Sequence, residues 1–231
     1  MKATKFKLPQ YTLAQELWNS ISHGLGAIFI AVGGGFLIEK ACYESNWVGI
    51  FSCSIFVFGV FLMFLMSCLY HSLAKNKGKQ VLRVLDHDFV YVAIMCTYVP
   101  YCLISLSKIP DSSFPWGYVI LGIVWAGCIT GITLNSINMK KFNVLSITLY
   151  VVLGSTICLA FYPLSLSLCL EGVLLLAFGG VSYWFGAILY GLGGKKNLWF
   201  HTVFHFFVTD DSHVRYFFHL SLANLVADFF A

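Results

Sequence analysis

Long apolar runs fill most of the chain and alternate with short polar segments. A helix needs about 20 apolar residues to cross roughly 30 Å of hydrocarbon. Seven runs satisfy this requirement, and they lie near residues 19–41, 47–70, 83–106, 115–137, 143–163, 165–191 and 199–221. The weakest boundary is the one between the fifth and sixth runs, where FYPLSL (161–166) supplies Pro163 and a few small polar residues as a turn.

Continuous runs of this length predict helices, because the strands of a membrane barrel alternate in polarity over about ten residues. The composition agrees, with 59% hydrophobic and 10% charged residues. We therefore predict an all-α fold, a polytopic bundle of seven transmembrane helices in the cell membrane that forms one domain over residues 1–231. No loop between the runs is long enough for a soluble domain, so the function is expected to lie within the bundle.

Lysines and arginines indicate the orientation of the bundle. Only Lys40 and Lys108 fall on one side, whereas the other side carries Lys2, Lys5, Lys7, Lys75, Lys77, Lys79, Arg83, Lys140, Lys141, Lys195 and Lys196. The positive-inside rule then predicts a cytoplasmic N-terminus and an outside C-terminus. The net charge of +4 is spread over these short loops, which argues against nucleic acid as a partner.

Polar residues from three runs are expected to meet near the cytoplasmic side. Ser67 and His71 are four residues apart at the end of the second run, Asp86 lies one turn into the third, and His201 and His205 begin the seventh. Imidazole and carboxylate groups are typical Zn²⁺ ligands, and ionisable residues at membrane depth are usually functional. Interhelical hydrogen bonding is the alternative explanation for the histidine pair.

Other polar residues leave more than one interpretation open. Glu16 and His23, at the cytoplasmic end of the first run, either approach the site or serve as capping and interfacial residues. His87 and Asp88 are rotated from Asp86 by about 100° and 200°, so we expect only Asp86 to face the site.

The outer part of the last run is also polar. Asp210, Asp211, His213 and Arg215 lie there, and Asp211 can pair with Arg215 at i, i+4. The alternative is a polar path or second site toward the outer face.

The segments ELWNSISHGLGA, SCLYHSL, RVLDHDFVYVAIMCTYVP and HTVFHFFV, in this order, resemble the hemolysin III family, the bacterial branch of the progestin and adiponectin receptor family. The resemblance implies a zinc ion near the cytoplasmic side held by His71, His201 and His205. It also implies that Asp86 reaches the zinc through water and that Ser67 lies one turn before the first ligand. The segment VTDDSHVRYF departs from the family pattern, which is usually apolar or small there.

The family is similar to membrane hydrolases that include alkaline ceramidases, which implies cleavage of lipid amides. In that hypothesis Asp86 orients the zinc-bound water or acts as general base, Ser67 hydrogen-bonds the water or oxyanion, and a membrane lipid is the substrate. A second hypothesis is a non-enzymatic receptor or regulator of membrane lipid state with structural zinc. A pore-forming cytolysin is the third, although no continuous face carries rings of charge.

Overall fold

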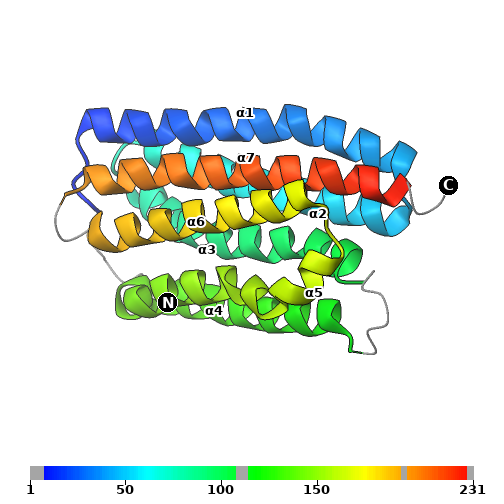
Figure 1. Cartoon of the computed structure of the whole chain (residues 1–231). Coiled ribbons are helices and arrows are strands. Elements are labelled where there is room, and N and C mark those ends of the chain that lie inside the picture. The colour runs from blue at the N-terminus through cyan, green and yellow to red at the C-terminus, as the bar shows by residue number, and fades with distance from the viewer. Residues whose placement is uncertain (1–7, 108–113, 194–196, 228–231) are drawn as a thin grey trace.

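A computed structural model describes residues 8–107, 114–193 and 197–227, and over these ranges the chain is helical and contains no strand. The predicted all-α fold is therefore confirmed. In Figure 1 the long helices lie side by side along one axis, with α1 and α7 at one edge and α4 and α5 at the other. The elements are α1 (Leu13–Glu44), α2 (Trp47–Ser72), α3 (Lys77–Pro100), η1 (Tyr101–Ser105), α4 (Trp116–Gly154), η2 (Thr156–Ala160), α5 (Phe161–Leu166), α6 (Leu170–Gly193) and α7 (Trp199–Ala227).

Side-chain caps determine where the first three helices begin. Thr12 and Gln15 form a reciprocal capping box at the start of α1. Asn46 caps α2, and Asn76 accepts a hydrogen bond from the Lys79 backbone at the start of α3. Each cap satisfies backbone N–H groups that have no partner within the helix. Because the connections are short, α1, α2 and α3 pack as antiparallel neighbours.

The chain reverses direction within α4. Asn138 has non-helical backbone angles (φ −158°, ψ 85°), and its side chain accepts a hydrogen bond from the Lys141 backbone. A Cβ atom on Gly127 would lie 2.5 Å from the Leu153 side chain, whereas a straight helix would separate these residues by about 39 Å. The element therefore consists of two antiparallel arms, and the break falls between the predicted runs 115–137 and 143–163.

The predicted turn at FYPLSL is wrong by a few residues. Residues 161–166 form the short helix α5, and the non-helical segment before α6 is 167–169. Pro163 lies in the first turn of α5, where a helix does not require the missing N–H group. Pro163 therefore marks the beginning of a short helix and not a turn.

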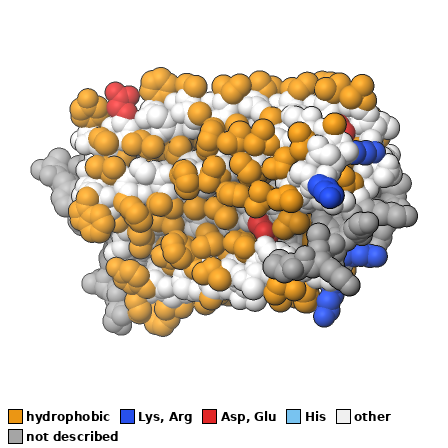
Figure 2. Space-filling view, turned by 180° about the vertical axis from the view of Figure 1, so that it is seen from behind, with side chains coloured by type: hydrophobic (Ala, Val, Ile, Leu, Met, Phe, Trp, Pro, Cys, Tyr) orange, Lys and Arg blue, Asp and Glu red, His pale blue; other side chains and the backbone are white. Residues whose placement is uncertain are grey.

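The exterior of the bundle matches lipid. Five helical stretches of the described chain are long and apolar enough to cross a membrane: Leu13–Glu44, Trp47–Ser72, Lys77–Ser105, Trp116–Leu166 and Leu170–Leu192. Large apolar side chains on these helices are exposed, including Ile28, Phe58, Ile129 and Phe178. Figure 2 shows hydrophobic side chains along the whole face and Lys and Arg side chains gathered at one end. The protein is a multi-pass integral membrane protein, while the count of seven spans and the orientation stay predictions.

Candidate metal centre

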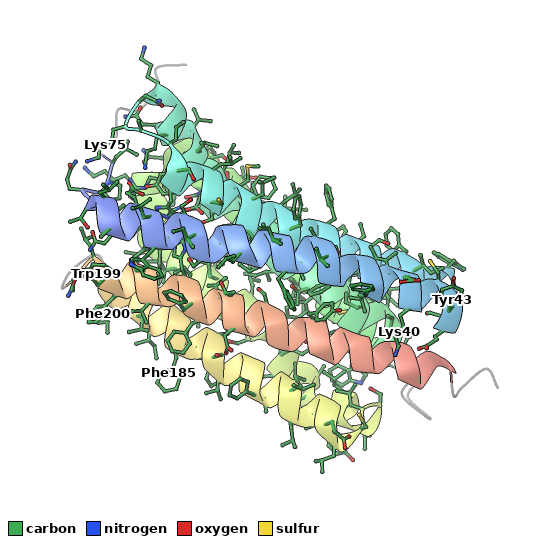
Figure 3. The ribbon with its side chains drawn as sticks, turned by 90° about the horizontal axis from the view of Figure 1, so that it is seen from above. Lys40, Tyr43, Lys75, Phe185, Trp199 and Phe200 are labelled. Atoms are coloured by element: carbon green, nitrogen blue, oxygen red, sulfur yellow. The ribbon has the colours of Figure 1, made fainter. Side chains whose placement is uncertain are left out.

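Three buried histidines meet at one end of the bundle. His71 is at the end of α2, and His201 and His205 are on the first turns of α7. One nitrogen from each ring lies within 4.8 Å of the others, and the Nε2 atoms of His201 and His205 are 3.1 Å apart. In Figure 3 the labelled residues Lys75 and Trp199, which flank these histidines in sequence, lie at the same end, opposite Lys40 and Tyr43. The structure thus brings together all three predicted ligands, and their role as zinc ligands stays a prediction.

The hydrogen bonds of His71 fit a metal ligand. Its Nδ1 atom lies 2.7 Å from Glu16 Oε2 and therefore donates to that carboxylate. Its Nε2 atom is buried and has no hydrogen-bond partner within the described part of the chain. A metal-bound histidine characteristically donates its other ring N–H to a carboxylate or carbonyl. A donor set of three imidazole nitrogens suits Zn²⁺.

Glu16 lies at the site. The sequence alone leaves open whether this residue approaches the site or serves as a capping or interfacial residue. The second oxygen of its carboxylate accepts a hydrogen bond from Lys79 Nζ at 2.7 Å, and the same ammonium donates to the Leu73 carbonyl at 2.9 Å. Lys79 is 3% exposed, so this carboxylate has a buried counter-charge. Glu16 links helix α1 to His71 and to the start of α3.

The same face of α1 carries two more residues of the site. Asn19 is fully buried, and its amide lies 3.4 Å from His71 Nδ1. The His23 ring stacks on the His205 ring with a centroid distance of 3.8 Å. Glu16, Asn19 and His23 follow the i, i+3, i+7 spacing of one helical face, and this spacing is the signal that could have assigned all three to the site.

Asp86 and Ser67 line a cavity beside the histidines. Both residues are buried, on α3 and α2 respectively. Asp86 lies within electrostatic reach of His71, and its Oδ2 atom is 3.5 Å from His87 Nδ1. The carboxylate is outside the group of three nitrogens. Its role and that of Ser67 stay predictions.

The prediction that only Asp86 of the DHD segment faces the site is wrong. His87 also lines the cavity, and its Nε2 atom lies 2.9 Å from the Tyr190 hydroxyl. The interior-facing stripe of a helix is at least about 100° wide, so a neighbouring residue with a long side chain shares it. Asp88 does face elsewhere, because it accepts hydrogen bonds from Asn135 at 2.7 Å and Ser136 at 2.8 Å.

The cavity extends from the histidines along α7. Its volume is about 100 Å³. His23, Ser67, Asp86, His201 and His205 form one end, and Asp211 and Ser212 form the other. Along α7 the two ends are separated by about 9 Å, the rise of the six residues from His205 to Asp211. The wall between them is mainly apolar and includes Val60, Met63, Ala93, Ile94, Phe204 and Val208. The cavity is thus polar at both ends and mainly apolar between them.

A second cavity reaches one of these histidines, His201, from the end of the bundle. It shares His87, Tyr190 and His201 with the first cavity and is also lined by Tyr11 and Arg83. The Tyr11 ring stacks on His201 at 5.3 Å. Burial raises the pKa of the Tyr11 phenol, so its hydroxyl remains neutral at physiological pH. This cavity therefore brings Tyr11 and Arg83 close to His201.

The acidic segment of α7 is divided between two environments. Asp210 accepts a hydrogen bond from Ser182 on α6 at 2.6 Å, and Asp211 lines the cavity. The side chains of His213 and Arg215 lie outside the described residues, so the predicted Asp211–Arg215 pair stays a prediction.

Comparison with known proteins identifies relatives over almost the whole chain. Residues 11–214 match the family model described as "Haemolysin-III related". A "Hemolysin-3 homolog" of Bacillus subtilis (strain 168) is 35% identical over 208 residues, which cover 90% of this chain and 93% of that protein. "Hemolysin-3" of Bacillus cereus is 31% identical over 203 residues, which cover 88% of this chain and 89% of that protein.

Proposed function

Because the chain belongs to the hemolysin III family, we propose that it holds a zinc ion with His71, His201 and His205 and hydrolyses lipid amides within the membrane. The observation that carries the metal site is the pairing of His71 Nδ1 with Glu16 while the buried Nε2 atom has no partner in the described chain. The hydrolytic chemistry is supported by the buried carboxylate of Asp86 in the wall of the same cavity.

The residues around the triad supply the remaining parts of a hydrolytic site. Bound zinc polarises a carbonyl group and lowers the pKa of water to about 7. Asp86 acts as general base, taking a proton from the attacking water and passing it to the leaving amine when the C–N bond breaks. His87 is fixed beside this carboxylate by hydrogen bonds to the Arg83 carbonyl at 3.0 Å and the Tyr190 hydroxyl at 2.9 Å. The Ser67 hydroxyl donates a hydrogen bond to the developing oxyanion.

The apolar wall of the cavity supports an acyl lipid as the substrate class. Its middle section carries Val60, Ile94 and Val208, which bury an acyl chain, while the polar atoms of the substrate lie beside the histidines. Exclusion of bulk water strengthens the interactions of Asp86 and Ser67 with the reacting groups. An N-acyl lipid of the ceramide type combines the required chain with the scissile amide.

The test is metal analysis and lipid-amide hydrolysis by purified protein. His71→Ala and His205→Ala should lose both zinc and turnover of a ceramide-like amide. Ser54→Ala is a matched control on α2, because the Ser54 hydroxyl donates to the backbone of its own helix. Turnover retained by a zinc-free variant would exclude the proposed mechanism.

Structural zinc in a non-enzymatic receptor or regulator is the second candidate function. It is favoured by the positions of the ligands, since a metal bound by His71 and His205 would tie the end of α2 to the start of α7. In that case zinc removal lowers the melting temperature, because a structural metal contributes folding free energy. A screen of lipid products would then reveal no turnover by the zinc-loaded protein.

Cytolysis is the third candidate, suggested by the name of the Bacillus cereus relative. Liposomes that contain the purified protein and a trapped dye provide the test. Release of dye supports pore formation, whereas retention of dye excludes it.

For the topology we infer seven spans with a cytoplasmic N-terminus. The reversal at Asn138 supports two spans within the long fourth stretch, and the 29-residue helix α7 supports a further one. The basic residues gathered at one end support the orientation. A phosphatase that is active only outside the cell should be active when fused after residue 112 and inactive when fused after residue 140. The reverse pattern would contradict the orientation.

A further inference from the structure

His23 is a fourth imidazole in the wall of the main cavity. It lies on α1, is 4% exposed, and stacks on His205 with an interplanar angle of 27°. It also makes a T-shaped contact with the Phe64 ring at a centroid distance of 5.1 Å. These two rings fix the plane of the imidazole, and His23 lines the cavity.

The polar atoms of His23 are unsatisfied. Neither Nδ1 nor Nε2 has a hydrogen-bond partner among the residues that the structure describes. An imidazole offers one N–H donor and one acceptor, and buried groups of this kind are hydrogen-bonded in the great majority of proteins. A partner within the cavity therefore accounts for a histidine at this position better than apolar packing does, since a phenylalanine would pack equally well.

His23 stands beside the group of candidate ligands. The nitrogens that lie within 4.8 Å of one another belong to His71, His201 and His205. His23 shares the cavity end with Ser67 and Asp86, which the proposed reaction uses for the oxyanion and the attacking water. This leaves His23 next to the space that the polar head of an acyl ligand would fill.

We propose that His23 binds the ligand directly, donating a hydrogen bond to, or accepting one from, the carbonyl or hydroxyl group of an acyl lipid in the cavity. This inference rests on the proposed function, because it takes the histidine triad as the metal centre. It adds a specificity-determining contact, which favours acyl ligands with a hydrogen-bonding head group over ligands that only coordinate the metal.

Binding to cobalt-loaded protein tests the contact without any measurement of turnover. Dodecanoyl hydroxamate and 1-dodecanethiol each contain twelve carbon atoms and both coordinate Co²⁺, and the hydroxamate alone carries a carbonyl and an N–OH group. Titration is followed through the visible absorption of Co²⁺. His23→Phe keeps the stacked ring and removes both nitrogens, whereas His23→Asn and His23→Gln each return an amide near the position of one nitrogen.

His23→Phe should bind cobalt like the wild type, bind the hydroxamate about tenfold more weakly, and bind the thiol unchanged. One of His23→Asn and His23→Gln should restore most of the hydroxamate affinity. Unchanged hydroxamate affinity in His23→Phe, equal weakening of both probes, or failure of both amides to restore binding would overturn the inference. Loss of cobalt from His23→Phe alone would make His23 part of the metal site and would also overturn it. Failure of wild-type protein to bind cobalt would overturn the proposed function together with the inference.

Discussion

Glu16 Oε2 lies 2.7 Å from Nδ1 of His71, which joins the first turn of α1 to the last turn of α2. This contact fixes the tautomer of His71, because the nitrogen that donates to the carboxylate cannot also bind a metal. The remaining nitrogen, Nε2, which is buried and has no hydrogen-bond partner in the described chain, is then the one available to a metal. Lys79 holds the same carboxylate from the other side at 2.7 Å.

The first prediction is that Glu16→Gln weakens zinc binding by about 10- to 100-fold, because the amide is a weaker acceptor and does not raise the basicity of His71. The measurement is competition between the purified protein and a chromophoric zinc chelator. Glu44→Gln is the matched control on the same helix, since Glu44 pairs with Lys40 at the opposite end of α1. Equal zinc affinity in the wild type and Glu16→Gln would mean that the triad does not bind zinc through His71 Nε2.

The second prediction concerns Asp86, which is buried in the cavity wall. Asp86→Asn should retain zinc, because the three imidazoles are unchanged, and should lower the rate of lipid-amide hydrolysis by about 10²- to 10⁴-fold through loss of the general base. Zinc content and turnover are measured on the same preparation. Loss of zinc from Asp86→Asn would instead identify the carboxylate as a ligand.

The positions of the triad could be predicted from the sequence because His71, His201 and His205 are polar residues at matching depths in otherwise apolar runs. Helical spacing alone places His201 and His205 on one face. The contribution of α1 could not be predicted in the same way, because capping explains polar residues near a helix start equally well. The rotation of α1 about its axis decides between these explanations, and packing against α2 and α7 sets that rotation.

Among the helix boundaries, too, some could be predicted from the sequence and others could not. The reversal near residue 138 is predicted, since Asn138, Lys140 and Lys141 interrupt two apolar runs. The start of α6 could not be predicted, because Pro163 is compatible both with a turn and with the first turn of a helix. The cavity could not be predicted either. It is lined by side chains from α2, α3, α6 and α7, which are far apart in the sequence, and the spacing of apolar residues within one helix does not predict contacts between such helices.

The third prediction tests the close packing of η1 against α4. A Cβ atom on Gly117 would lie 2.2 Å from the backbone oxygen of Cys102, which cannot move as a flexible side chain does. Gly117→Ala should therefore destabilise the protein by about 1–3 kcal/mol, measured by thermal unfolding in detergent. Gly122→Ala in the same helix is the control, because no described atom lies within 4 Å of its added Cβ. Similar melting temperatures for the two variants would show that this contact is looser than the structure indicates.

The fourth prediction separates the Asp88 cluster from the metal centre. Asp88 is 7% exposed and accepts hydrogen bonds from Asn135 and Ser136 on the first arm of α4. Asp88→Ala leaves the buried amide of Asn135 without its acceptor and should destabilise the protein by about 2 kcal/mol. Zinc content should remain at the wild-type level, because the cluster lies on a different face of α3 from Asp86.

Asp88→Asn is the informative companion variant, because its amide oxygen can still accept one of the two hydrogen bonds. Its melting temperature should fall between those of the wild type and Asp88→Ala. If Asp88→Ala loses more zinc than folded protein, the Asp86 and Asp88 carboxylates both act on the metal centre, and the prediction is wrong. The comparison is made on folded material isolated by size-exclusion chromatography, with zinc measured per mole of protein.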